Sequence, residues 1–95
     1  MKKVYIASLC KNGMLGGGLH IDEVKVTFRT GKVTVPAKLR NLEMRYEDIE
    51  KITEGSLLLL PSVTIKLKNG EEWRFVVFAR RDFLRVIKAF TGDIQ

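Results

Sequence analysis

The stretch that decides the fold is Val63-Thr64-Ile65-Lys66-Leu67-Lys68-Asn69-Gly70-Glu71-Glu72-Trp73-Arg74-Phe75. Apolar and polar residues alternate on both sides of Asn69-Gly70, a pattern typical of two half-buried strands joined by a turn that needs positive φ. A two-residue loop would place Ile65 opposite Arg74 on the buried face, which a core cannot tolerate. A three-residue loop, Lys68–Gly70, places Ile65 opposite Trp73 instead. The sequence therefore predicts a hairpin with this longer loop, whose glycine takes the left-handed position of a bulge.

The residues after the hairpin predict a helix from Arg80 to Thr91. Apolar residues recur there at three- and four-residue spacing, namely Phe83, Val86, Ile87 and Phe90, with Leu84 at the margin of their face. Arg81, Arg85 and Lys88 share the opposite stripe. Gly92 is expected to end the helix. An amphipathic helix in this place can cover one end of a β-barrel with its apolar side.

Short alternating segments also fill the N-terminal two thirds of the chain. We expect strands at 3–9, 19–21, 24–29, 33–35, 42–47 and 49–53, and loops at 11–18, 37–41 and 54–56. The apolar pattern favours Ile21 beside Val24, and Phe28 facing Val33 across a turn at Thr30-Gly31. The expected fold is mainly β, a bent antiparallel barrel of about seven strands capped by one C-terminal helix.

Length and composition indicate one domain, residues 1–95, with a net charge of +6. The chain has no apolar run of about 18 residues, so no transmembrane helix is expected. The apolar segment after Met1 stops at Lys11 and alternates like a strand, which argues against a signal peptide. The single cysteine, Cys10, excludes an internal disulfide and favours a cytoplasmic location. The positive charge indicates an anionic neighbour, or it serves solubility alone.

The chain resembles the pleckstrin-homology-like superfamily, and within it the GRAM-type domains and small bacterial relatives. The resemblance rests on the segments 19–28, 44–52, 63–67, 73–78 and 81–84. It implies a bent seven-stranded structure with a C-terminal helix and a non-catalytic binding role toward anionic lipids or proteins. Lys11 corresponds to a lysine of lipid-binding members near the end of the first strand, whereas Leu19-His20-Ile21 lacks the basic triplet that those members carry on the second. The lipid and protein alternatives therefore both stay open.

Two surface regions are candidates for binding an anion or a lipid. In the glycine-rich segment before Leu19, Met14 and Leu15 could enter a membrane while Lys11 meets a headgroup, or they fold back onto the barrel. A second region is basic and comprises Lys25, Arg29, Lys32, Lys38 and Arg40. These cations attract anions together or are simply solvated. No aromatic residues are interleaved with them, which disfavours binding of single-stranded nucleic acid.

The leucine run before Pro61 is a candidate interface. Leu57, Leu58, Leu59 and Leu60 cannot all face inward from one strand. Some of them form an exposed patch that serves as a dimer interface or membrane contact, or the run belongs to a loop or irregular segment that covers a barrel edge.

Catalysis has little support in this composition. The chain contains one histidine and one cysteine, and nothing in the sequence orients Cys10 and His20 as a nucleophile and base. Metal ligands do not cluster, so neither a metal nor another cofactor is expected. Arg80 and Arg81 open the predicted helix, where the helix dipole disfavours cations. A bound phosphate would reconcile these charges, or the helix simply tolerates a small electrostatic cost. The function predicted is peripheral contact with anionic membrane lipid or a protein partner. A self-associating module and a nucleic-acid-binding barrel are the alternatives.

Overall fold

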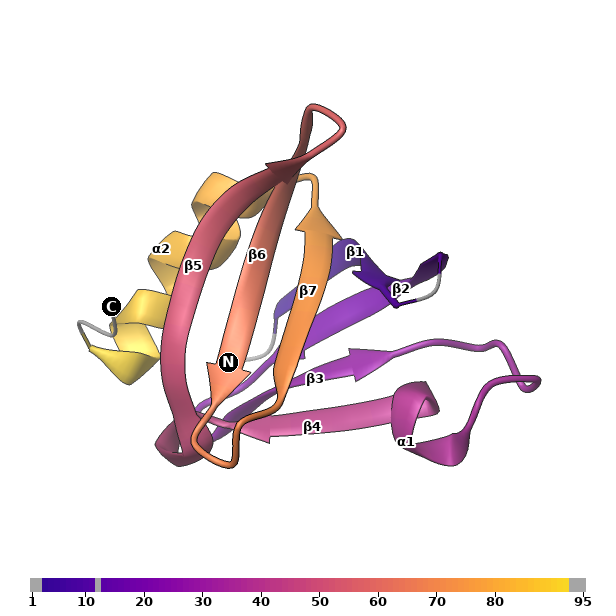
Figure 1. Cartoon of the computed structure of the whole chain (residues 1–95). Coiled ribbons are helices and arrows are strands. Elements are labelled where there is room, and N and C mark those ends of the chain that lie inside the picture. The colour runs from indigo at the N-terminus through magenta and orange to yellow at the C-terminus, as the bar shows by residue number, and fades with distance from the viewer. Residues whose placement is uncertain (1–2, 12, 93–95) are drawn as a thin grey trace.

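The computed structural model describes residues 3–11 and 13–92 and has one antiparallel sheet of seven strands with a C-terminal helix (Figure 1). Residues 1–2, 12 and 93–95 of the expected domain lie outside the described residues. The strands are β1 (Lys3–Cys10), β2 (Met14–Ile21), β3 (Lys25–Arg29), β4 (Asn41–Arg45), β5 (Ile49–Leu57), β6 (Leu60–Leu67) and β7 (Glu72–Val77). The helices are α1 (Ala37–Arg40), η1 (Tyr46–Asp48) and α2 (Arg80–Thr91).

The sheet curls into a half-barrel with the strand order β4-β3-β2-β1-β7-β6-β5. All neighbouring strands are antiparallel, and β4 and β5 form the two edges. Apolar side chains from every strand meet those of α2 in one core. The mainly β fold with about seven strands and a C-terminal helix, expected from the sequence, is therefore confirmed.

The C-terminal hairpin has the register that its alternation predicts. Ile65 pairs with Trp73 and Val63 with Phe75, and all four side chains are buried. The loop spans Lys68–Gly70, and its glycine has φ = 97°. The three-residue loop is favoured because it alone keeps both faces of the hairpin consistent.

Helix α2 also has the predicted bounds, and Gly92 follows it with φ = 73°. Phe83 and Ile87 are completely buried, as expected from their spacing. Phe90 is half-buried and stacks on the ring of Tyr46, with 5.9 Å between the ring centroids. The apolar stripe of α2 thus covers one side of the half-barrel.

A polar cluster ties β1 to α2 at the surface of this core. The hydroxyl of Tyr5 donates to Oδ2 of Asp82 at 2.5 Å, and Lys3 Nζ approaches the same oxygen at 3.3 Å. Arg85 pairs with the other carboxylate oxygen. Burial, together with the bond to Asp82, raises the pKa of Tyr5 to about 12. The bonds from Tyr5, Arg85 and Lys3 hold the pKa of Asp82 well below its usual range.

The expectation of a loop over 11–18 is wrong, because β2 begins at Met14 and runs through the glycines. Ala7 pairs with Gly17 and Ile6 with Gly18 in a continuous ladder with β1. A Cβ on Gly17 would overlap the carbonyl oxygen of Arg29 and lie 2.9 Å from the Phe28 ring. The glycines therefore do not break the strand, and Gly17 lets β3 approach β2 closely.

The expected pairing of β2 with β3 is displaced by two residues. Ile21 pairs with Val26, and Val24 lies in the turn with its side chain about half exposed. The turn is wider than expected because Oδ1 of Asp22 accepts hydrogen bonds from the backbone N–H groups of Val24 and Lys25, at 2.7 and 2.9 Å. A displacement of two residues keeps the same side chains on the buried face.

The expected hairpin between Phe28 and Val33 does not form. Phe28 pairs with Leu42 of β4, whereas Val33 lies in the connection and is 76% exposed. Pro36 precedes the short helix α1, which occupies most of the region expected to be a loop. Leu42 and Met44 offer β3 a better apolar partner than the valines do, since both are buried against it.

Two further boundaries differ from the sequence-based expectation. The strand expected to reach Glu47 ends at Arg45, and η1 follows it. The loop expected at 54–56 belongs to β5, which continues to Leu57 and pairs with β6 up to the turn at Leu58-Leu59. β5 is mostly exposed, and its polar residues mask its strand character in the sequence.

Candidate functional site

Four of the predicted binding residues line one small pocket at the open end of the half-barrel. Lys11, Met14 and Leu15 come from the hairpin end of β1 and β2, and Lys32 comes from the β3–α1 connection. The pocket has a volume of about 200 Å³, and Leu9, Val35 and Leu39 contribute apolar lining. Two cations at an apolar depression could hold a group that has both an anionic and an apolar part.

The ring of Trp73 lies beside Lys11 and also beside Lys38, a third predicted cation. The sequence does not indicate this role of Trp73. Lys11 Nζ lies 5.0 Å from the centroid of the indole ring and Lys38 Nζ lies 5.5 Å from it. Lys38 also pairs with Glu71 at 2.7 Å, and Trp73 Nε1 donates to the other oxygen of that carboxylate at 3.4 Å. The bond from Lys38 lowers the pKa of Glu71. Cation–π contacts thus hold Lys11 and Lys38 in place beside the pocket.

The remaining basic candidates lie apart from this pocket. Lys25 and Arg29 border a separate depression on the outer face of β3, where Lys25 Nζ lies 3.0 Å from the carboxylate of Glu43. Arg40 is exposed at the end of α1, and its carbonyl accepts a hydrogen bond from Thr30. The basic residues predicted as one surface are therefore divided between two places.

The leucine run forms a two-residue turn at the end of the β5–β6 hairpin. Leu57 pairs with Leu60, and the side chains of Leu58 and Leu59 between them are 89% and 97% exposed. Their φ angles are 51° and 71°. Of the alternatives that the sequence left open, the exposed patch is correct and the irregular segment covering an edge is wrong.

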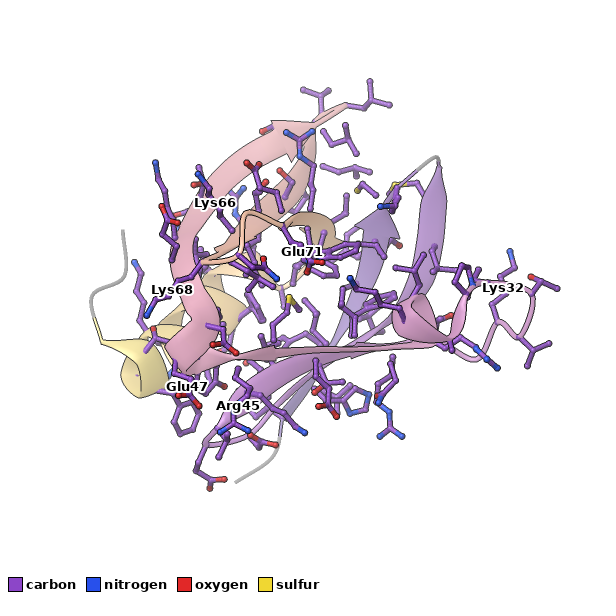
Figure 2. The ribbon with its side chains drawn as sticks, turned by 60° about the horizontal axis from the view of Figure 1, so that its bottom comes forward. Lys32, Arg45, Glu47, Lys66, Lys68 and Glu71 are labelled. Carbon is purple, nitrogen blue, oxygen red and sulfur yellow. The ribbon has the colours of Figure 1, made fainter. Side chains whose placement is uncertain are left out.

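Three chain connections lie along one edge of the molecule, at the upper right of Figure 1. They are the β5–β6 turn, the hairpin end of β1 and β2, and the β3–α1 connection. Figure 2 shows them in the same order along the same edge, with Lys32 near one extreme. Their exposed side chains include Lys11, Met14, Lys32, Val33, Leu58 and Leu59. Since α2 lies on the opposite side, a flat surface could contact all three connections at once.

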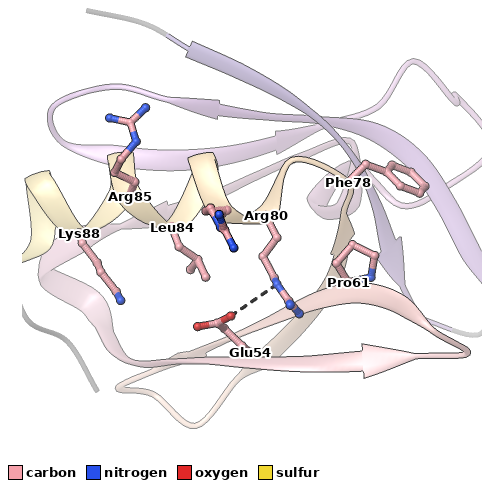
Figure 3. Close-up of a pocket in the computed structure, with 8 residues that line it drawn as sticks. Glu54, Pro61, Phe78, Arg80, Leu84, Arg85 and Lys88 are labelled. Carbon is pink, nitrogen blue, oxygen red and sulfur yellow. Dashed lines mark ion pairs between the residues drawn. The ribbon is translucent and has the colours of Figure 1, made fainter.

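A groove of about 630 Å³ separates α2 from the β5–β6 hairpin (Figure 3). Among the described residues that line it are four cations, Arg80, Arg81, Arg85 and Lys88, and one carboxylate, that of Glu54. Arg80 Nε lies 3.5 Å from Glu54, and the same guanidinium donates to the carbonyl oxygens of Gly55 at 2.6 Å and Ser62 at 3.4 Å. Arg80, for which the sequence leaves a bound phosphate or simple tolerance of a small electrostatic cost open, fastens α2 to the hairpin through these contacts.

Cys10 and His20 do not form a reactive pair. They occupy opposite ends of the β1–β2 ladder, because Cys10 pairs with Met14 and His20 with Val4. Six residue steps separate the two pairs, a distance on the order of 20 Å. The Cys10 thiol instead contacts Met14 Sδ at 3.5 Å.

The described part of the chain offers neither a metal-binding cluster nor a membrane-spanning helix. Within residues 3–11 and 13–92, no three histidine, cysteine or carboxylate side chains gather in a way that could hold a metal ion. Over the same residues, no helix combines the length and the apolar character that crossing a bilayer requires.

Comparisons with known proteins identify the fold alone. No protein-family model matches the chain, and no curated protein matches it. The crystal structure of the C-terminal domain of an unknown protein from Leishmania infantum has a similar fold, with a TM-score of 0.79 and 9% sequence identity. The alignment covers 96% of this chain and 83% of that chain. At this identity the similarity shows a common architecture and does not transfer a function.

Proposed function

We propose that this protein is a non-catalytic, pleckstrin-homology-like binding module that docks peripherally on an anionic membrane surface. The observation that carries the proposal is the row of three connections along one edge, each with exposed apolar or cationic side chains. Folding alone does not require solvent-exposed Met14, Val33, Leu58 and Leu59 to gather on the same edge. A bilayer accepts such side chains and attracts the lysines beside them.

Electrostatics supports the same surface. The chain carries a net charge of +6, and Lys11 and Lys32 lie within the row. Each lysine or arginine close to an anionic bilayer contributes about 1 kcal/mol to binding, and salt screens this attraction. Two or three such cations give weak, reversible attachment by themselves, so the apolar tips must add to it.

Vesicle co-sedimentation tests the proposal. The protein should bind phosphatidylcholine vesicles that contain phosphatidylserine, bind pure phosphatidylcholine vesicles much more weakly, and dissociate as salt is raised. The variant K11E/K32E should lose most of the binding. The matched control K51E/K88E changes net charge by the same amount on β5 and α2, away from the row, and should bind nearly as well as the wild type. Equal binding by the two variants would mean that only the net charge matters, and it would refute docking through this row of connections (the docking edge).

A second candidate function is self-association through the edge strand β5. This strand spans Ile49–Leu57 and pairs only with β6 among the described strands, so one side of its backbone is open to another strand. Light scattering over a wide concentration range tests it. A monomer at every concentration would dispose of this candidate and leave membrane docking.

A further inference from the structure

The turn at Leu58-Leu59 has an amino-acid sequence that its backbone disfavours. A two-residue hairpin loop with positive φ at both central residues is the type that selects Asn-Gly or Gly-Gly. Leucine in this left-handed region brings its Cβ close to the following carbonyl oxygen. Two consecutive leucines at φ = 51° and 71° therefore carry a conformational penalty at both positions.

Burial against the described part of the domain does not compensate for this penalty. The two side chains are 89% and 97% exposed, so neither contributes to the core. The two leucines lower stability in two ways: their backbone conformation is unfavourable, and their apolar side chains remain in water. Backbone outliers of this kind cluster at functional sites, where their side chains contact a ligand or partner.

The size of the turn indicates a bilayer as that partner. A stable protein interface buries about 800 Å² on each side, far more than two leucine side chains at a narrow tip can supply. A bilayer needs no matching pocket, because its fluid chains close around any apolar group that enters.

The charges behind the turn agree with an anionic bilayer. Arg80 binds the carbonyl oxygens of Gly55 and Ser62, a residue pair two steps from the Leu57–Leu60 pair, or about 7 Å along the strands. Apolar faces of interfacial proteins enter to a depth of about 5–10 Å. Insertion of the leucines would therefore bring Arg80 and the exposed Arg81 to the level of the lipid phosphates. Phe78, which is 61% exposed, lines the same groove and would lie at the interface.

We propose that the Leu58-Leu59 turn is a membrane anchor, which inserts both leucines between the acyl chains of an anionic bilayer. This inference rests on the proposed membrane function and assigns it an inserting element that acts separately from the Lys11–Lys32 pocket. In this arrangement, electrostatic attraction brings the docking edge to the surface, and the leucine turn prolongs its residence there.

The variant L58N/L59G separates this role from folding, because it installs the sequence that the turn prefers. It should melt at the same temperature as the wild type or higher. Its partition coefficient onto vesicles of phosphatidylcholine and phosphatidylserine should fall at least about tenfold, since full burial of one leucine side chain corresponds to roughly ten- to a hundredfold in an equilibrium constant. The matched control V24N removes an exposed apolar side chain from the β2–β3 turn, and it should bind like the wild type.

A second measurement reports insertion directly. In the variant L59W, vesicles with brominated acyl chains should quench the fluorescence of the new tryptophan. The wild type supplies the baseline, because Trp73 is buried in the core. An unquenched L59W signal on vesicles that demonstrably bind the protein would overturn the proposal.

The remaining outcomes distinguish this inference from the proposed function. If the wild type fails to bind either kind of vesicle, the membrane function itself is refuted. If the wild type binds and L58N/L59G binds equally well, the anchor is refuted while membrane docking stands. If the wild type forms a dimer in solution that L58N/L59G abolishes, the turn serves a second copy of the chain, and the membrane anchor is again refuted.

Discussion

The two turns at the ends of β6 solve the same geometric problem with opposite kinds of residue. At one end, Lys68–Gly70 closes the β6–β7 hairpin with a glycine at φ = 97°. At the other end, Leu58 and Leu59 close the β5–β6 hairpin, both at positive φ. The first turn uses residues that the backbone prefers, and the second uses residues that it disfavours.

The Lys68–Gly70 turn has the residues that its backbone requires, whereas the Leu58-Leu59 turn has residues that the fold only tolerates. β6 is held between its neighbours by buried Val63 and Ile65, so it can accept one unfavourable turn without losing its register. A turn that departs from local preference on such a strand is then informative about function, because selection for stability alone would replace its leucines.

The largest expected effect comes from the strand between the turns. Ile65→Ala removes a completely buried side chain and should lower the free energy of unfolding by about 2–5 kcal/mol. Denaturant unfolding measures it. Lys66→Ala, on the opposite face of the same strand, should change stability by less than about 0.5 kcal/mol. Similar losses from both variants would mean that the core does not hold β6.

Gly70→Ala should have a smaller effect, which arises only from the backbone. A Cβ at Gly70 meets no atom within 4 Å, so the cost is that of placing a non-glycine residue at positive φ, about 1 kcal/mol. Gly16→Ala is the matched control, because its Cβ also meets open space and its backbone lies in a regular strand. It should leave the denaturation midpoint nearly unchanged. Equal losses would contradict the conformational explanation.

L58N/L59G should act in the opposite direction at the other turn. Removing two strained residues should raise the free energy of unfolding by about 1 kcal/mol. The same denaturant titration measures this gain. A loss of stability would show that the leucines support the hairpin through contacts within the domain, and the contrast between the turns would disappear.

A test at high pH shows whether the turns are independent of the β1–α2 cluster. The pKa of Tyr5 is raised to about 12, above the value of about 10 expected in the unfolded chain. Its contribution is fully present below pH 10 and is lost as the pH rises toward 12. Tyr5→Phe should therefore unfold with a shallower pH dependence in this range. Gly70→Ala and L58N/L59G remove no ionisable group and should keep the slope of the wild type.

The parts of the fold that the sequence predicts are those governed by local rules. The β6–β7 register follows from alternation and a glycine, and α2 follows from its apolar spacing and Gly92. The start of β2 and the partner of β3 depend on distant contacts instead. Gly17 lies in a strand because Phe28 and Arg29 approach it closely, and no local pattern contains that information.

The candidate site shows the same division. Residue type alone indicates Lys11, Lys32, Lys38 and the leucines as surface groups. Their grouping requires the curl of the sheet, which brings the β1–β2 end to the β3–α1 connection. Trp73 was assigned to the core from its position in the strand, and only the tertiary structure reveals the two ammonium groups at its ring. The φ angles of Leu58 and Leu59 likewise depend on the pairing of β5 with β6, which the leucine run does not indicate.

The hydrogen bond between Tyr5 and Asp82 has a consequence for how the protein folds during translation. These residues are 77 positions apart, and β1 also needs β7, through the pair Ala7–Val77, as one of its two neighbours. Among the described strands, β1 must therefore wait for β7, with β2 as its one neighbour in the meantime. Translation at about 5–20 residues per second makes that wait last several seconds. The half-barrel is expected to close only after α2 has emerged, so a nascent chain paused before Phe83 should remain accessible to chaperones and proteases.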